Sequence, residues 1–335
     1  MGNLINELRA RAKTLGFSAL WVTDASPFAA WAQVMRARGD RFGASLEADP
    51  RAILPSAKRV VVLAYPYRDV PGPLFPLVAV SPYYLASHKA YRALPALADW
   101  LREQGWQAVA RPPLPAKPAA LRAGAGLYGR NGLILTEKHG SSVALALLLT
   151  DAELPLEVQT GPETGIETEL GVSSAPECLC CTACVLACPV DALDGTSVVD
   201  TSRCLRAHMF SDAPVPAAYR ALMGNRLLGC DRCQRVCPCN VRARENAPPA
   251  ETLRLELRAL LGDDASRREA LRLIEEKVGA NYARLHRVLA QAALLAGNSG
   301  DARYLPVLLP LCNSKNASLR EHAFWASEKL TRRRG

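Results

Sequence analysis

The cysteines of this chain fall into two runs with regular spacing. The first run is Cys178-x2-Cys181-x2-Cys184-x3-Cys188, followed by Pro189. The second run is Cys230-x2-Cys233-x3-Cys237, followed by Pro238, with Cys204 upstream of it. Because the thiolate is the form of cysteine that binds metals, this crowding predicts metal ligation by sulfur.

Two [4Fe–4S] clusters account for this spacing better than other uses of cysteine. Bacterial ferredoxins hold two clusters with such runs, and the fourth cysteine of each run ligates the other cluster. Structural zinc is usually bound by two separated cysteine pairs. Disulfides would require an exported protein. The sequence therefore predicts a protein that moves electrons one at a time.

The same crossing rule predicts which cysteines share a cluster. The first cluster is expected to be held by Cys178, Cys181, Cys184 and Cys237. The second cluster is expected to be held by Cys204, Cys230, Cys233 and Cys188. Of the remaining cysteines, Cys180 and Cys239 are expected to pack near the clusters without ligating them, and Cys312 to lie buried on a helix.

Length, composition and charge limit the number of domains, the cellular compartment and the kind of partner. The chain of 335 residues is long enough for two or three domains. Its N-terminus reads as an amphipathic helix without a signal peptide, and no apolar stretch is long enough to span a membrane. Eleven cysteines without an export signal indicate a reducing cytoplasm. The formal net charge of +9 is compatible with a polyanionic partner such as RNA.

Hydrophobic patterns predict alternating helices and strands in the first half, and therefore an α/β or α+β domain. Helices are expected at 4–15, 28–38 and 83–104, and strands at 18–22 and 59–64. Two further strands, 132–136 and 142–150, are expected to be joined by a turn at His139-Gly140. An acidic segment, 151–176, is expected to connect this half to the clusters. Beyond Pro248-Pro249, two helix pairs are expected at 266–279 with 282–296, and at 301–312 with 318–332.

A series of short stretches along the chain, taken together with their order, is typical of one protein family. They are Leu15-Gly16-Phe17, Asp49-Pro50-Arg51, Leu54-Pro55-Ser56-Ala57, His88-Lys89, Ala125-Gly126-Leu127-Tyr128-Gly129-Arg130-Asn131-Gly132, the cysteine motifs, Gly224-Asn225-Arg226, Gly297-Asn298-Ser299-Gly300-Asp301 and His322-Ala323-Phe324-Trp325-Ala326. By these stretches the whole chain resembles the epoxyqueuosine reductase family, whose members perform the last step of tRNA queuosine synthesis.

The resemblance implies an α+β protein with three parts. Residues 1–172 would form an α/β domain that binds cobalamin, 173–245 a ferredoxin-like domain with two [4Fe–4S] clusters, and 246–335 a HEAT-like helical domain. It also implies a ferredoxin or flavodoxin-type electron donor and a tRNA partner. Gly126, Gly129, Arg130 and Asn131 would contact cobalamin, the glycines by allowing a bulky ligand to approach the backbone.

One departure from the family concerns the proton donor. The family has an Asp upstream of the glycine segment, where this chain has Pro112, and proline cannot act as a general acid. Tyr128 is a candidate replacement, with packing as the alternative. His88, where the family has a pocket histidine, is the second catalytic candidate, with a packed or surface position as the alternative.

Two classes of function follow from these residues. The first is a cobalamin-dependent iron–sulfur reductase that acts on a tRNA base or, as a paralogue, on another substrate. The second is an electron-transfer protein that reduces the corrinoid of a partner. Arg226, Arg232, Arg235, Arg242 and Arg244 form a basic group beside the second run. This group would contact phosphates, form a solvated face or balance the charge of the clusters.

Overall fold

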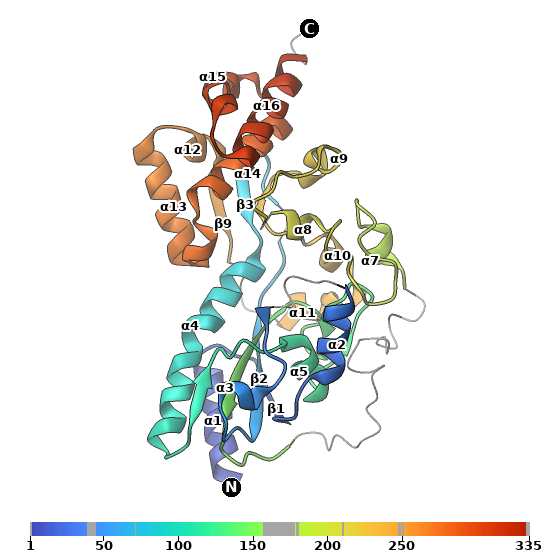
Figure 1. Cartoon of the computed structure of the whole chain (residues 1–335), viewed down its shortest axis with the longest axis vertical. Coiled ribbons are helices and arrows are strands. Elements are labelled where there is room, and N and C mark those ends of the chain that lie inside the picture. Colours follow the sequence, from blue (N-terminus) through green and yellow to red (C-terminus); the bar gives the residue numbers. More distant parts are fainter. Residues whose placement is uncertain are drawn as a thin grey trace.

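The structure of the protein is a computed structural model, and it describes residues 2–38, 45–70, 72–156, 178, 181–209, 211–246, 249 and 251–332. The first helix, α1 (Gly2–Thr14), and the last, α16 (Ala317–Arg332), lie towards opposite ends of the longest axis (Figure 1). The predicted connecting segment 151–176 lies mostly outside the described residues, which resume at Cys178.

A four-stranded sheet forms the centre of the N-terminal half. Its order is β1 (Ala19–Asp24), β2 (Arg59–Pro66), β7 (Val143–Thr150) and β4 (Ala108–Ala110). Every neighbouring pair is antiparallel. Helices and strands therefore alternate along the chain without building a parallel sheet. Of the two predicted classes, α+β describes this half, and the prediction of an α/β domain for residues 1–172 is wrong because every strand pair of the sheet is antiparallel.

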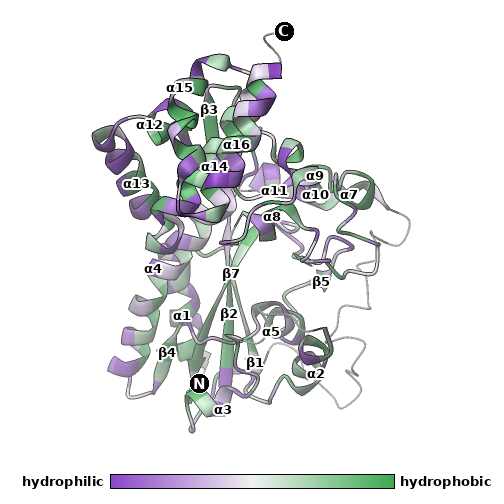
Figure 2. Cartoon of the chain, turned by 45° about the horizontal axis from the view of Figure 1, so that its top comes forward, coloured by the Kyte–Doolittle hydropathy of each residue, from purple (hydrophilic) through white to green (hydrophobic). Residues whose placement is uncertain are grey.

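Helices cover both faces of this sheet because its central strands are apolar on both sides. Side chains alternate along β2, so that Val61 and Leu63 belong to one core, and Val60 and Val62 to the other. The first core includes side chains of α1 and α4 (Pro82–Glu103). The second includes side chains of α2 (Ala29–Arg38), α3 (Pro50–Ile53) and α5 (Ala116–Arg122). Coloured by hydropathy, β1 and β2 stand out as green strands between these helices (Figure 2).

One predicted strand pairing is wrong. The strands expected at 132–136 and 142–150 do not pair with each other. Instead β6 (Ile134–Leu135) pairs with β5 (Leu127–Tyr128), and β7 lies between β2 and β4. The turn at His139-Gly140 exists and is closed by a bridge between Thr136 and Gly140. The long apolar run of β7 is buried at the centre of the sheet, which leaves the short β6 to pair with a local neighbour.

A second sheet joins the three predicted parts of the chain. Its central strand, β3 (Leu77–Val80), pairs in parallel with β8 (Arg226–Leu228) and antiparallel with β9 (Leu253–Glu256). Each strand comes from a different one of the ranges 1–172, 173–245 and 246–335. The cysteine-rich part is thus hydrogen-bonded to both of its neighbours through one sheet.

Short helical turns follow the cysteines. They are α7 (Ala183–Leu186), α8 (Leu205–His208), α9 (Ala217–Arg220), η3 (Ala221–Met223), α10 (Arg232–Arg235), η4 (Pro238–Asn240) and α11 (Val241–Asn246). The turns α7 and α10, which come from the two different cysteine runs, contact each other. The fold therefore brings the two runs side by side.

The C-terminal region is helical, with one predicted helix interrupted. Its elements are α12 (Leu257–Leu261), α13 (Asp264–Val278), η5 (Ala280–Tyr282), α14 (Leu285–Ser299), η6 (Ala302–Tyr304), α15 (Leu305–Leu308), η7 (Pro310–Asn313) and α16. The helix expected at 301–312 is broken into three pieces, and Pro306 and Pro310 within it lack the backbone N–H that a regular helix uses. Among the described residues, no helix is long and apolar enough to cross a membrane.

Candidate iron–sulfur centres

Four predicted ligands meet at one hollow. Cys178, Cys181, Cys184 and Cys237 line an empty volume of about 320 Å³, part of it open to solvent. Cys178 and Cys237 are each 8% exposed and pack together against Leu135. Cys239 lines the same hollow, and Cys180 lies outside the described residues. The hollow thus collects three thiols of the first run and the last thiol of the second.

The remaining four predicted ligands, Cys188, Cys204, Cys230 and Cys233, form a second group. Burial raises the pKa of the Cys233 thiol, and so do the neighbouring thiols Cys230, Cys204, Cys184 and Cys188. Cys188, Cys204 and Cys230 pack against the large core that β3, β8 and the C-terminal helices share. The Cys188 sulfur accepts the backbone N–H of Ala192 at 3.3 Å. Cys188 therefore lies with the cysteines of the second run, although it belongs to the first.

The thiols of the first group line a hollow instead of meeting at one point. Within the described ranges, no three His, Cys, Asp or Glu side chains are close enough together to hold a single metal ion. A cluster of four irons and four sulfides is larger than one ion, so its four thiolates stand further apart. Burial also raises the pKa values of the Cys184 and Cys237 thiols, so that forming their thiolates costs free energy. Binding to iron would offset this cost.

Hydrogen bonds join the second cysteine run to the N-terminal sheet. The Asn240 side-chain oxygen accepts the backbone N–H of Ser141 at 2.7 Å, and the Gln234 amide donates to the Tyr67 hydroxyl at 2.7 Å. The Gln234 amide also donates to the Ser141 carbonyl at 2.9 Å. All four side chains are buried. These residues were not predicted to be functional. Only the positions of Gln234 and Asn240, each three residues from Cys237 in the sequence, pointed to them.

The predicted cobalamin-contacting glycines are explained by the chain itself. A Cβ added at Gly126 would lie 2.2 Å from the Leu135 carbonyl oxygen. A Cβ added at Gly129 would lie 2.9 Å from the Asn131 side-chain oxygen and 3.0 Å from a Leu135 methyl carbon. The space beside both glycines is therefore filled by the β5–β6 hairpin. The chain itself therefore requires glycine at both positions, and their contact with cobalamin stays a prediction.

Arg130 and Asn131 lie in the turn of this hairpin, between β5 and β6, and line the first thiol hollow. Asn131 is 3% exposed, and its side-chain oxygen accepts the backbone N–H of Leu133 at 3.2 Å. It therefore stabilises the turn between β5 and β6. Arg130 brings a positive charge to the hollow that Cys178, Cys181, Cys184 and Cys237 share.

The two predicted catalytic residues lie in different environments. Tyr128 is 8% exposed and packs in the core beneath β2 and β7, and burial raises the pKa of its hydroxyl. His88 is half-buried on α4, next to Gly279 at the end of α13. Burial lowers the pKa of His88, and Arg92 lowers it further. No contact between the two side chains occurs in the described part of the chain, and their catalytic roles stay predictions.

The predicted basic group is not a single surface. Arg226 is 7% exposed and forms an ion pair of 2.5 Å with Asp231, so two of the three alternatives, contact with phosphates and a solvated face, do not apply to it. Arg232 donates to the Leu222 carbonyl at 3.0 Å, and Arg244 donates to the Arg235 carbonyl at 2.8 Å. The Arg242 side chain lies outside what the structure describes.

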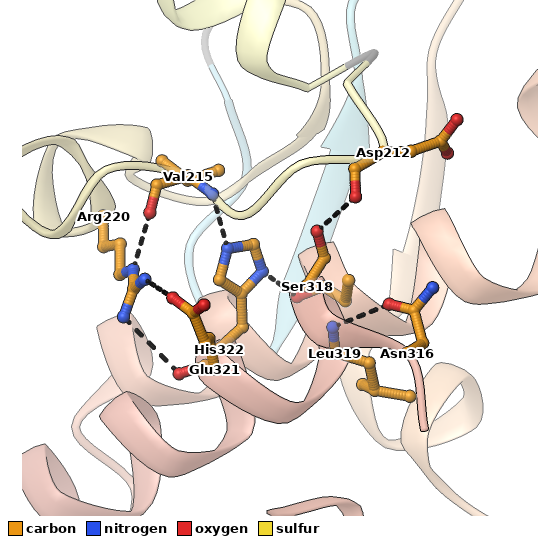
Figure 3. A network of polar contacts seen from close by, with 9 residues as sticks. Asp212, Val215, Arg220, Asn316, Ser318, Leu319, Glu321 and His322 are labelled. Carbon is orange, nitrogen blue, oxygen red and sulfur yellow. Dashed lines mark hydrogen bonds and ion pairs between the residues drawn. The ribbon is translucent and has the colours of Figure 1, made fainter. Parts of the chain in front are cut away.

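A second polar network fixes the loop after α8 to the C-terminal helices (Figure 3). The Val215 backbone N–H donates to His322 Nε2 at 2.9 Å, so the ring proton lies on Nδ1, 2.9 Å from the Ala290 carbonyl oxygen. Arg220 donates to the Val215 carbonyl at 2.8 Å and pairs with Glu321 at 2.9 Å. His322, the first residue of the stretch His322-Ala323-Phe324-Trp325-Ala326, therefore has a structural role in this network.

Comparison with known proteins agrees with this geometry. Residues 177–240 match the family model of a 4Fe-4S double cluster binding domain. An epoxyqueuosine reductase of Gloeobacter violaceus is 31% identical over 263 residues, which cover 71% of this chain and 76% of the relative. One of Bacillus subtilis is 30% identical over 307 residues, which cover 84% of this chain and 74% of the relative. This chain belongs to the epoxyqueuosine reductase family.

Solved structures of epoxyqueuosine reductases share the fold. A selenomethionine-labelled enzyme matches with a TM-score of 0.79 at 25% identity, over 98% of this chain and 90% of the other. The enzyme of Bacillus subtilis matches with a TM-score of 0.78 at 25% identity, over the same shares.

Some sequence alignments with curated relatives are shorter. The epoxyqueuosine reductase of Aliivibrio fischeri is 35% identical over 163 residues, which are 40% of its length.

The sequence predicted one departure from the epoxyqueuosine reductase family, a proline at position 112 in place of a proton-donating Asp. Pro112 is buried after β4, and its carbonyl accepts the backbone N–H of Leu114 at 2.8 Å. Its neighbour Arg111 has a φ of 61° and places its guanidinium 4.2 Å from the centre of the Tyr91 ring. This loop is therefore held by packing, and Pro112 itself offers no proton.

Proposed function

We propose that this chain is an iron–sulfur reductase with two [4Fe–4S] clusters in crossed ligation. Cys178, Cys181, Cys184 and Cys237 hold the first cluster, and Cys204, Cys230, Cys233 and Cys188 hold the second. The observation that carries the proposal is the hollow lined by three thiols of one run and the last thiol of the other. The contact between α7 and α10 supports relay of single electrons between the two clusters.

The substrate that family membership supports is epoxyqueuosine in tRNA. The relatives are named epoxyqueuosine reductases, and one structure of the same fold is of such an enzyme with an epoxyqueuosine-modified tRNA stem loop. We propose residues 1–172, 173–245 and 246–335 as the catalytic, cluster and HEAT-like helical parts, the last helping to hold tRNA. A ferredoxin or flavodoxin-type protein is the proposed electron donor.

Cobalamin is proposed as the cofactor on the ground of the family alone. When bound, it would supply a cobalt centre that accepts electrons from the clusters. Gly126 and Gly129 remain proposed contacts, with the β5–β6 hairpin filling the space on the Cβ side of both. Arg130 and Asn131 line the first thiol hollow and are the candidates for a contact between cofactor and cluster.

Pro112 favours a second candidate function. A reductase without the family's proton donor would act on a different substrate, or would pass electrons to the corrinoid of a partner protein. Tyr128 and His88 remain the proposed catalytic residues for the first function. A Tyr128→Phe variant removes one hydroxyl and keeps the ring. A proton donor lost in this way lowers turnover by about 10²–10⁴-fold, whereas a packing residue leaves turnover unchanged.

Anaerobic turnover of an epoxyqueuosine-containing stem loop by the reconstituted full chain tests this function. Cobalamin binding is measured beforehand by visible absorption. The proposal predicts stoichiometric binding and conversion to queuosine, with a Cys237→Ala variant inactive and a Cys312→Ala control active. Bound cobalamin without conversion would favour another substrate. Intact clusters without cobalamin binding would favour the electron-transfer protein.

A further inference from the structure

Arg206 lies next to the second cysteine group in the sequence. Arg206 lies two residues after Cys204, on α8, for which Cys204 is the N-terminal cap. Its Nε donates to the Tyr84 hydroxyl at 3.0 Å. Among the described residues, no carboxylate lies within ion-pair distance of the Arg206 guanidinium, and a guanidinium keeps its charge at every physiological pH.

Aromatic rings hold this charge in place. The Arg206 guanidinium carbon lies 4.4 Å from the centre of the Tyr83 ring and 5.3 Å from that of Tyr84. The Tyr83 and Tyr84 rings meet edge to face at 5.2 Å, and Tyr84 meets Tyr282 in the same way at 5.1 Å. Tyrosine rings attract a cation without neutralising it. Arg206 is therefore fixed in orientation while its full positive charge remains.

The same tyrosine connects Arg206 to another predicted ligand. Tyr84 is 1% exposed and packs directly on Gly229, where an added Cβ would lie 2.6 Å from the Tyr84 ring. Gly229 precedes Cys230, which packs with Cys204 against the same core. Arg206 thus lies on the helix that Cys204 caps, and Tyr84 links its guanidinium to the segment that carries Cys230.

We propose that Arg206 is a positioning residue that raises the reduction potential of the second cluster by placing an uncompensated positive charge beside it. The inference rests on the proposed function, since it requires the second cluster. On reduction, the oxidised cluster takes one electron from the donor, and no bond is broken. A nearby cation stabilises the added negative charge, and partial burial limits the screening by solvent.

Arg203 provides a matched control in the same loop. It lies one residue before Cys204, but it pairs with Asp191 at 3.4 Å and its side chain is 43% exposed. Arg203→Gln removes the same charge as Arg206→Gln, from a position where a carboxylate and solvent already balance it. A general effect of net charge would change the potential equally in both variants. A local effect would appear in Arg206→Gln alone.

The experiment is a redox titration of the anaerobically reconstituted full chain with dithionite, followed by electron paramagnetic resonance. Arg206→Gln is expected to lower the equilibrium constant for reduction of the second cluster at least tenfold, which is about 59 mV for one electron. The first cluster is expected to keep its potential. Arg206→Lys, which keeps the charge but loses the planar stacking, and Arg203→Gln are expected to stay within about threefold of the unaltered chain, a shift of about 28 mV by the same conversion.

Two results would overturn the inference. One is an unshifted second cluster in Arg206→Gln with both clusters present, and the other is an equal shift in Arg203→Gln. If Arg206→Gln fails to retain iron, Arg206→Met keeps the apolar stem and is titrated in its place. A chain that takes up no second cluster would contradict the proposed function itself. Iron content, measured first, therefore separates the two failures.

Discussion

The Asn240 side chain accepts the backbone N–H of Ser141 at 2.7 Å and donates to the Gln234 carbonyl at 2.8 Å. One amide thereby joins the turn before β7 to the end of the second cysteine run. Asn240 is 2% exposed, so water cannot replace these contacts. The position of Cys237, three residues before Asn240, therefore depends on the N-terminal sheet.

Asn240→Ala is expected to lower the free energy of unfolding. It leaves the Ser141 N–H unpaired in the interior, at about 1–3 kcal/mol, whereas the Gln234 carbonyl still accepts the backbone N–H of Cys237 at 3.2 Å. Anaerobic urea titration of the reconstituted chain measures the loss. Asn281→Ala, at an exposed position of η5, is the control and should change stability by less than about 0.5 kcal/mol. Equal losses in the two variants would contradict the assigned role of Asn240.

Gly126→Ala should disrupt the β5–β6 hairpin. The new Cβ would lie 2.2 Å from the Leu135 carbonyl oxygen, and the backbone at Gly126 has a φ of +158°. Gly105→Ala is a matched control, since Gly105 has a φ of +89° with no atom within 4 Å of an added Cβ. Urea titration should show a loss of more than about 3 kcal/mol for Gly126→Ala and of about 1 kcal/mol for Gly105→Ala. Similar losses would mean that backbone strain, not the clash, governs Gly126.

Stability should fall as the pH drops below about 6.5, because His322 is buried in its neutral form. Burial lowers its pKa from 6.5 to about 4, so the unfolded state binds more protons between these values. Above pH 6.5 the neutral His322 contributes its full share to the free energy of unfolding. By pH 5 about 2 kcal/mol of that free energy should be lost.

The free energies of unfolding of the chain and of His322→Gln, measured at pH 7.5 and pH 5, test this prediction. The variant should lack the loss that His322 causes, because glutamine does not titrate. His286→Gln, an exposed position on α14, should keep the pH dependence of the unaltered chain. The same pH dependence in His322→Gln as in the unaltered chain would assign the effect to other groups.

Local sequence patterns predicted some elements well. β2 was predictable because Val60, Val61, Val62 and Leu63 form an uninterrupted apolar run, which a strand buried on both faces requires. The two cysteine groups were predictable because spacing alone limits which thiols share a cluster. Both features depend on residues that are close together in the sequence.

Long-range pairings could not be predicted in this way. Strands β3, β8 and β9 have three or four residues each, too few to establish a period of two. Arg226 reads as a surface cation in a basic stretch. Its burial follows from the 2.5 Å ion pair with Asp231 and from its position in β8, which becomes visible only once the second sheet is formed.

The most direct test of the account is the cluster content of Cys237→Ala. After anaerobic reconstitution, the unaltered chain should bind about eight iron atoms, as two [4Fe–4S] clusters. Electron paramagnetic resonance of Cys237→Ala should show the first cluster lost or converted and the second intact, while a Cys312→Ala control keeps both. Loss of only the second cluster in Cys237→Ala would contradict the crossed ligation on which the account rests.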